Sequence, residues 1–104
     1  MSDTSSKPKV LIVDDETINI QFIGNVLRDY ADVIFATNGK DALMIAKANS
    51  PDIILLDIVM PDMDGYEVCK KLKEDSDMGH IPIIFVTAES SSEDEARGLS
   101  LGAI

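Results

Sequence analysis

Apolar residues in this chain gather in four short runs, and polar residues separate each run from the next. The runs are Lys9–Val13, Asp32–Ala36, residues 52–56 and residues 81–86. A short apolar run between turn residues is typical of a strand buried on both faces, although periodicity alone also allows a buried helical segment. For residues 52–56 a strand is favoured, because Pro61 and Gly65 follow closely. The pattern therefore predicts four strands.

The segments between the strands carry apolar residues at helical spacing. We expect a first helix capped by Asp15 and running to about Tyr30, since an aspartate side chain can accept a hydrogen bond from a free helical N–H. Its predicted buried side is formed by Ile20, Ile23, Val26, Leu27 and Tyr30. A second helix would be capped by Asn38 and end near Ser50, with Ala42, Leu43 and Ala46 on its buried side.

Two further helices are predicted by capping boxes, in which an acidic residue stands three positions after the capping residue. These are Asp64 with Glu67, and Ser92 with Glu95. The last helix would end at Gly102. Strands that alternate with helices of ten to fifteen residues predict an α/β fold with a parallel sheet. We expect residues 1–8 to be a flexible N-terminal tail and residues 9–104 to form one domain.

The charge of the chain is strongly negative, with 19 acidic and 9 basic residues and a formal net charge of −10. This balance argues against a direct nucleic-acid surface, which needs a basic patch, and suits a basic partner or a cation. A single cysteine, Cys69, excludes an intrachain disulfide and is compatible with a reducing compartment. With a polar start and no long apolar run, we expect a cytoplasmic protein without a membrane span.

Acidic residues follow two of the predicted strands directly. Asp14 and Asp15 come after the first strand, Asp57 comes after the third, and Thr87 follows the fourth. The carboxyl ends of parallel strands share one edge of the sheet, so these side chains should converge if the first and third strands are neighbours. Few oxygen ligands with room for water suit Mg²⁺. The alternative is that the acids only cap helices or open a loop.

Three motifs resemble the receiver domain of two-component response regulators. They are Asp14-Asp15 after Val-Leu-Ile-Val, Asp57 followed by Met60-Pro61-Asp62-Met63-Asp64-Gly65, and Val86-Thr87-Ala88. The similarity covers residues 9–104. It implies a phosphoprotein of a phosphorelay, in which Asp57 accepts a phosphoryl group from a sensor histidine kinase or a phosphotransfer protein. Such a module is not a turnover enzyme, although it can catalyse its own phosphorylation and dephosphorylation.

The resemblance also assigns the remaining site residues. Asp15 corresponds to the direct Mg²⁺ ligand, Asp14 acts mostly through water, and the main-chain carbonyl of Val59 is a further ligand beside Asp57. Thr87 corresponds to the hydroxyl that engages the phosphoryl group, and small Ala88 leaves it access. A haloacid-dehalogenase-type phosphatase would instead need an aspartate two residues after the nucleophile, where this chain has Val59.

The resemblance implies a flavodoxin-like, doubly wound sheet with strand order 2-1-3-4, truncated before the family's fifth strand and helix. The family lysine that pairs with the phosphoryl group lies beyond Ile104. An alternative function is therefore a phosphorylation-independent interaction or dimerisation domain with an impaired site. The missing neighbour would leave the fourth strand as an unpaired edge, so a homodimer through that strand is a further expectation.

Overall fold

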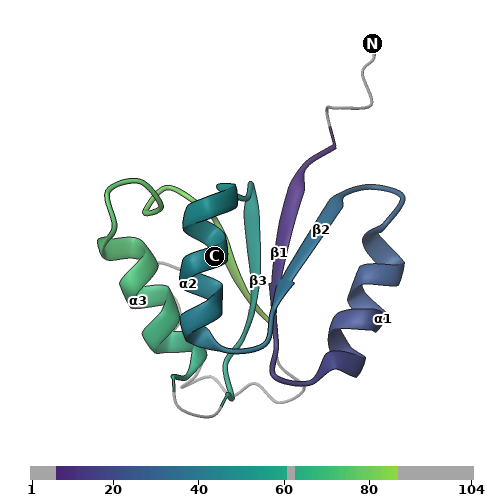
Figure 1. The fold of residues 1–104 in the computed structure, drawn as a ribbon, viewed down its shortest axis with the longest axis horizontal. Helices are drawn as coiled ribbons and strands as arrows, with labels where there is room; N and C mark the ends of the chain where they lie inside the picture. Colours follow the sequence, from purple (N-terminus) through teal and green to yellow (C-terminus); the bar gives the residue numbers. More distant parts are fainter. Residues whose placement is uncertain (1–6, 61–62, 87–104) are drawn as a thin grey trace.

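The computed structural model describes residues 7–60 and 63–86, and strands alternate with helices throughout (Figure 1). The elements are β1 (Lys9–Val13), α1 (Thr17–Leu27), β2 (Asp32–Ala36), α2 (Gly39–Asn49), β3 (Ile53–Asp57), α3 (Gly65–Glu74) and β4 (Ile83–Val86). The helix expected after Ser92, together with Thr87 and Ala88, lies outside the described residues. The four predicted strands and the first three predicted helices are all present.

The four strands form one sheet in the order β2-β1-β3-β4, and every neighbouring pair is parallel. This confirms the α/β fold class and the expected strand order. Val13, the last residue of β1, lies opposite both Ala36 of β2 and Leu56 of β3. Asp57, the last residue of β3, lies opposite Val86, the last residue of β4. The carboxyl ends of all four strands therefore share one edge of the sheet.

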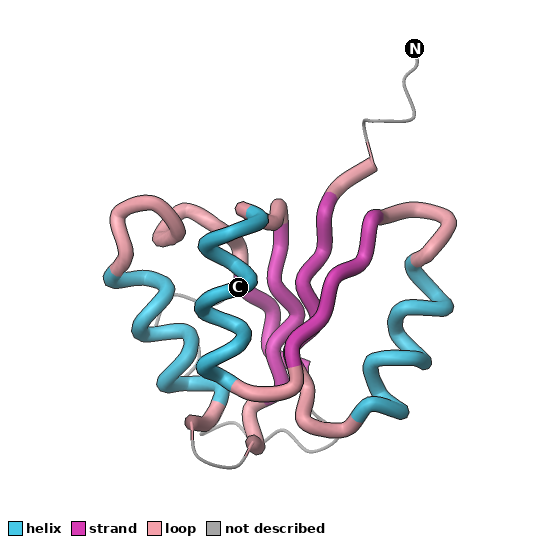
Figure 2. Tube along the Cα trace, viewed as in Figure 1, coloured by secondary structure: helices cyan, strands magenta, loops and turns pink. Residues whose placement is uncertain are grey.

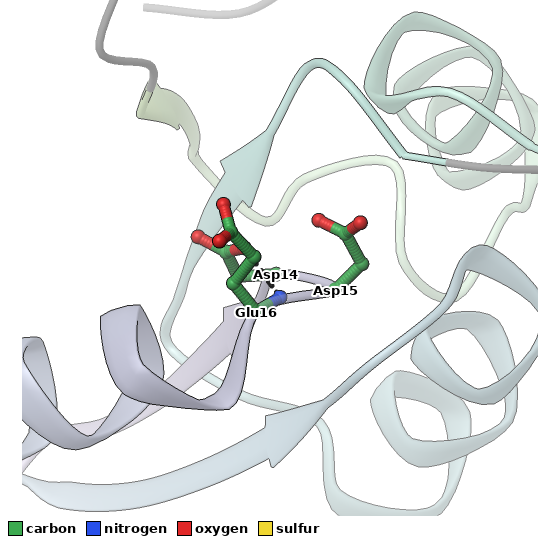
Figure 3. Close-up of side chains that lie close together, drawn as sticks. All are labelled: Asp14, Asp15 and Glu16. Carbon is green, nitrogen blue, oxygen red and sulfur yellow. Dashed lines mark hydrogen bonds between the residues drawn. The ribbon is translucent and has the colours of Figure 1, made fainter.

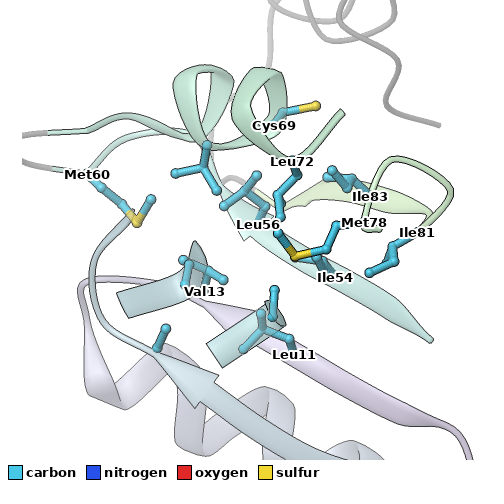
Figure 4. Close-up of a cluster of buried hydrophobic side chains, with 14 residues drawn as sticks. Leu11, Val13, Ile54, Leu56, Met60, Cys69, Leu72, Met78, Ile81 and Ile83 are labelled. Carbon is cyan, nitrogen blue, oxygen red and sulfur yellow. The ribbon is translucent and has the colours of Figure 1, made fainter. Parts of the chain in front are cut away.

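Helices cover the two faces of the sheet unequally, with α2 and α3 on one side and α1 on the other (Figures 1 and 2). The larger hydrophobic cluster lies under α2 and α3, and its fully buried side chains include Leu11, Ile54, Leu56, Val68, Leu72 and Ile83 (Figure 4). The smaller cluster, on the α1 side, joins Val10 and Ile12 to Ile20 and Ala31. Alternate residues of β1 thus supply both clusters, as expected for a strand buried on both faces.

The start of α1 differs from the expectation. The helix begins at Thr17 with Glu16 as its N-cap residue, which makes no side-chain cap hydrogen bond. Asp15 therefore does not cap it. The carboxylate of Asp14 instead accepts a hydrogen bond from the Glu16 N–H at 2.9 Å, upstream of the helix.

The end of α1 also differs from the expectation, because the helix stops at Leu27. The N–H groups of Tyr30 and Ala31 both donate to the Leu27 carbonyl oxygen, which closes the helix in a turn. Ala31 then enters the core, whereas Tyr30 is 73% exposed. Val26 is 58% exposed as well, so these two predicted core residues face outward.

The strand boundaries shift slightly for reasons of hydrogen bonding. Asp52 lies before β3, where its carboxylate accepts a hydrogen bond from the Lys9 N–H at 2.8 Å. β4 begins at Ile83 and not at residue 81, because Pro82 has no N–H to donate, although its carbonyl oxygen accepts from Ile54. None of the helices within residues 7–60 and 63–86 has the length and apolar character needed to cross a membrane.

Candidate functional site

The sheet itself brings the acidic residues together. The connection from β1 leads to β2 on one side, while β3 pairs with β1 on its other side. Such a point, where the chain direction across the sheet reverses, leaves a crevice outside the carboxyl ends of the strands. Asp14 directly follows β1, and Asp57 ends the neighbouring β3.

Asp14 is the most constrained of these acids. Its side chain is 5% exposed, and it is the one charged residue that is buried among those the structure describes. Its N–H donates to the Ala36 carbonyl oxygen at 3.1 Å, and its carboxylate accepts from the Glu16 N–H at 2.9 Å. Burial of a carboxylate is costly unless it is hydrogen-bonded or paired, so a buried aspartate at this position indicates a functional role and not a residue that only improves solubility.

Asp15 and Glu16 are both exposed, and each offers a carboxylate oxygen close to that of Asp14. The three oxygens lie within 4.8 Å of one another (Figure 3). Glu16 was not among the metal ligands expected from the sequence. The signal that could have found it is the unbroken Asp14-Asp15-Glu16 run, since the turn after β1 keeps successive acids at the same strand end.

Asp57 is partly buried, and its electrostatic surroundings disfavour its charge. Burial first, and then the nearby charge of Asp14, raise its pKa from 3.8 to about 6. Asp15 adds to the rise through its charge and a hydrogen bond between the two side chains, whereas the Val59 N–H, 3.4 Å from a carboxylate oxygen, opposes it. The structure therefore brings Asp14, Asp15 and Asp57 into mutual electrostatic contact.

Of the other residues expected at the site, Val59 lies two positions beyond Asp57, with its side chain 73% exposed. Its main chain is turned so that the N–H reaches the Asp57 carboxylate. Thr87 and Ala88 lie outside the described residues, and the last described residue before them, Val86, is the register partner of Asp57.

The residues present fit a magnesium ion. The donor set consists of carboxylate oxygens, with no histidine and no thiol within the described cluster. Mg²⁺ prefers oxygen ligands, uses one or two protein carboxylates and keeps several waters, and exposed Asp15 and Glu16 leave room for that water. A divalent cation would also offset the repulsion from Asp14 and Asp15, which adds to the effect of burial in raising the Asp57 pKa.

Comparison with known proteins supports one family. The family model described as "Response regulator receiver domain" matches residues 10–104. A probable cyclic di-GMP phosphodiesterase of Vibrio cholerae is 46% identical over 99 residues, which cover 95% of this chain and 22% of the relative. The response regulator PleD of Caulobacter vibrioides is 42% identical, and the match covers 91% of this chain and 21% of that protein. The chain thus spans about a fifth of the length of these relatives.

Solved structures agree with the sequence relatives. The chemotaxis protein CheY4 of Vibrio cholerae, crystallised at low pH, matches with a TM-score of 0.89 and 34% identity, over 94% of this chain and 82% of that one. The phosphorylated cyanobacterial phytochrome response regulator RcpA matches with a TM-score of 0.86 and 26% identity, over 94% and 77% of the two chains. By sequence, strand order and acidic edge, this chain belongs to the response regulator receiver domain family.

Proposed function

We propose that this chain is a phosphoacceptor module of a two-component phosphorelay and that Asp57 accepts the phosphoryl group. The observation that carries the proposal is the position of Asp57. It ends a central strand, is partly buried, and lies beside two further carboxylates in a chain of the receiver family. A signalling role is supported by the relatives of this chain, which include the response regulator PleD and the regulatory protein PhoP of Bacillus subtilis.

In the proposed reaction the Asp57 carboxylate attacks the phosphorus atom of a phosphohistidine on a sensor kinase or a phosphotransfer protein. A new P–O bond forms, the P–N bond breaks, and the histidine nitrogen leaves with the electron pair. The Val59 N–H lies 3.4 Å from one Asp57 oxygen and helps to orient the carboxylate for the attack. Asp14 is fixed by two hydrogen bonds, one from its own N–H to the Ala36 carbonyl oxygen and one from the Glu16 N–H to its carboxylate, which hold its side chain at the end of β1.

The residues that would hold Mg²⁺ are Asp14, Asp15, Asp57 and the Val59 main-chain carbonyl. When bound, the ion supplies positive charge against the phosphoryl oxygens, which would otherwise be repelled by the acidic edge. We assign Thr87 and Ala88, from the family motif, to binding the phosphoryl group and to leaving space for it. Most of the catalysis in phosphoryl transfer is positioning and electrostatic stabilisation, and this chain would supply that for its own phosphorylation and dephosphorylation.

The proposed partners follow from the same chemistry. This chain is 41% identical over 97 residues to part of "Histidine kinase P4" of Formosa agariphila. That similarity supports a role for this domain type alongside kinase domains. The formal net charge of −10 suits a partner with basic contact residues in the cytoplasm.

Treatment with a small phosphodonor and Mg²⁺ tests the proposal. Intact mass spectrometry should show one added phosphoryl group on the wild-type chain and none on Asp57→Asn. The matched control is Asp29→Asn, which makes the same change at an exposed position in the turn after α1, at the opposite edge of the sheet. Asp29→Asn should be modified as fully as wild type. Modification that persists in Asp57→Asn would exclude Asp57 as the acceptor.

A further inference from the structure

Gly65, the first residue of α3, lies directly against the main chain that carries Asp57. A Cβ atom at this position would overlap the Asp57 carbonyl oxygen and come within 2.8 Å of the Ile58 Cα and 3.0 Å of the Asp57 carbonyl carbon. All three are main-chain atoms, which cannot rotate aside as a side chain can. The φ angle of Gly65 is not in the left-handed region, so glycine is required here for space and not for backbone freedom.

A hydrogen bond holds the two segments in this contact. The Gly65 N–H donates to the Ile58 carbonyl oxygen at 2.8 Å, and Gly65 is buried. The Asp64 side chain meanwhile accepts from the Glu67 N–H at 2.9 Å, which fixes the start of α3. The first turn of α3 is thus fastened to the chain that leaves β3.

The contact lies on the main chain that links the Asp57 carboxylate to Val59. The Asp57 carbonyl carbon and Ile58 separate the Asp57 carboxylate from Val59, whose N–H reaches that carboxylate at 3.4 Å. A displacement of this short segment would therefore move both the carboxylate and the Val59 main chain relative to Asp14 and Asp15, which follow the separate strand β1.

Gly39 provides a contrast within the same fold. It is also buried, is also the first residue of a helix, and also follows a side-chain cap. A Cβ atom there would meet the Met63 Sδ and the Val68 Cγ2, both at 2.8 Å, and the Met63 Cβ at 2.9 Å. All three are side-chain atoms, and none belongs to Asp57 or Ile58. The same substitution would therefore strain the packing of α2 against Met63 and α3 without direct contact with the Asp57 main chain.

We propose that Gly65 is a positioning residue, whose lack of a side chain lets α3 fix Asp57 and Val59 at the distance from Asp14 and Asp15 that phosphoryl transfer needs. This inference rests on the function proposed above. A misplacement of about 1 Å can cost on the order of 10²-fold in rate, and loss of support for a metal ligand typically costs about 10–100-fold in affinity.

The test compares three glycine-to-alanine variants. For Gly65→Ala we expect, per folded molecule, a phosphorylation rate lower by about 10²-fold and a Mg²⁺ affinity lower by at least about tenfold. Gly39→Ala, the matched control, should lose stability but keep the rate and affinity of wild type. Gly24→Ala should be at least as stable as wild type, because its nearest neighbour would be the Val33 Cγ1 at 3.9 Å and alanine favours the helix.

The double variant Gly24→Ala/Gly65→Ala separates positioning from simple instability. Denaturant titration gives the folded fraction of each protein, and sucrose in the buffer raises it where needed. If Gly65 positions the site, the rate of the double variant stays low at full folding. If the rate returns to wild type once the chain is folded, Gly65 is only structural and the inference is overturned.

A readout without phosphorylation distinguishes this inference from the proposed function. In amide NMR spectra of the metal-free proteins, Gly65→Ala should shift the Ile58 and Val59 signals, whereas Gly39→Ala should leave them in place. If wild type itself takes up no phosphoryl group, the proposed function fails, and these shifts still decide whether Gly65 sets the geometry. Unchanged Ile58 and Val59 signals in a folded Gly65→Ala protein would overturn the positioning role.

Discussion

At the scale of single residues, Asp57 carries a charge that its surroundings disfavour. Its pKa is raised from 3.8 to about 6 by burial, then by Asp14 and Asp15. A carboxyl whose folded-state pKa is raised contributes stability that is fully present below its unfolded pKa, near 3.8, and lost as pH rises through about 6. The free energy of unfolding of the metal-free protein should therefore include a contribution from Asp57 that falls between pH 4 and pH 7.

The variant Asp57→Asn isolates this contribution. Because asparagine is neutral, the metal-free variant should be more stable than wild type at pH 7, and the difference should shrink as pH falls toward 4. Urea unfolding at several pH values, in the presence of a chelator, measures it. Mg²⁺ at pH 7 should stabilise wild type more than the variant. A difference between the two proteins that does not change with pH would contradict the shifted pKa.

Mg²⁺ binding should depend on individual acids of the cluster. We expect Asp15→Asn to weaken binding strongly, because an exposed carboxylate beside Asp14 is available as a direct ligand. Glu16→Gln should weaken it as well if the third carboxylate of the cluster takes part, and Asp29→Asn serves as the control for lost charge alone. Titration calorimetry measures the affinities, which should fall at low pH because the ligands must be ionised. An Asp15→Asn protein with wild-type affinity would disprove the assignment.

At the scale of helices and strands, the end of α2 stores local strain. Ser50, the C-cap residue of α2, has a left-handed backbone with a φ of 48°, and its N–H donates to the Ala46 carbonyl oxygen at 2.8 Å. Glycine adopts this conformation without the steric cost, which is about 1–2 kcal/mol for other residues. Part of that gain is lost because glycine is more flexible when unfolded.

We therefore expect Ser50→Gly to raise the free energy of unfolding by up to about 1 kcal/mol without changing Mg²⁺ affinity. Ser50→Ala, which retains a Cβ atom, is the control and should give no such gain. Denaturant unfolding compares the three proteins. A Ser50→Gly protein less stable than Ser50→Ala would show that the strain at this turn is negligible.

The elements also show which features a sequence can predict. The Asn38 and Asp64 caps were predicted correctly, because their side chains accept from N–H groups three residues ahead and need no distant partner. The start of α1 was predicted wrongly, because the Asp14 carboxylate accepts from the Glu16 N–H in a local turn and the helix begins only after Glu16, which makes no side-chain cap hydrogen bond. Apolar spacing also placed Val26 and Tyr30 in the core, since α1 carries apolar residues on its outer side too.

For the site, the sequence motifs placed Asp14, Asp15 and Asp57 at strand ends, and the parallel sheet necessarily brought those ends to one edge. The close contact of Gly65 with the Asp57 main chain could not be predicted in the same way. It depends on the approach of Gly65 to Ile58, seven positions earlier, and glycine in that motif is equally consistent with a turn.

At the scale of the whole molecule, β4 pairs only with β3 among the described strands. A sheet edge of apolar residues that stays unpaired is a template for pairing with another chain, and β4 carries Ile83, Ile84, Phe85 and Val86. The α1 side adds exposed apolar area, since Ile18 is 69% and Phe22 is 71% exposed. We propose that the 104-residue chain either dimerises through β4 or is a marginally stable monomer. A phosphorylation-independent interaction domain would be favoured if that dimer forms equally in Asp57→Asn.

Sedimentation and thermal unfolding across a range of concentrations test this proposal. We expect self-association that grows with concentration or a low unfolding temperature. Ile84→Lys, which puts a charge on the edge strand, should reduce self-association. A strictly monomeric chain at high concentration with a sharp, high-temperature unfolding transition would show that β4 causes neither self-association nor low stability.

The most direct test of the central claim is chemical trapping of the phosphorylated residue. An aspartyl phosphate is reduced by borohydride to homoserine, which peptide mass spectrometry locates in the sequence. After incubation with a phosphodonor, we expect homoserine at position 57 in the presence of Mg²⁺, and little or none in its absence. Homoserine at another acidic residue, or equal trapping at position 57 with and without Mg²⁺, would contradict it.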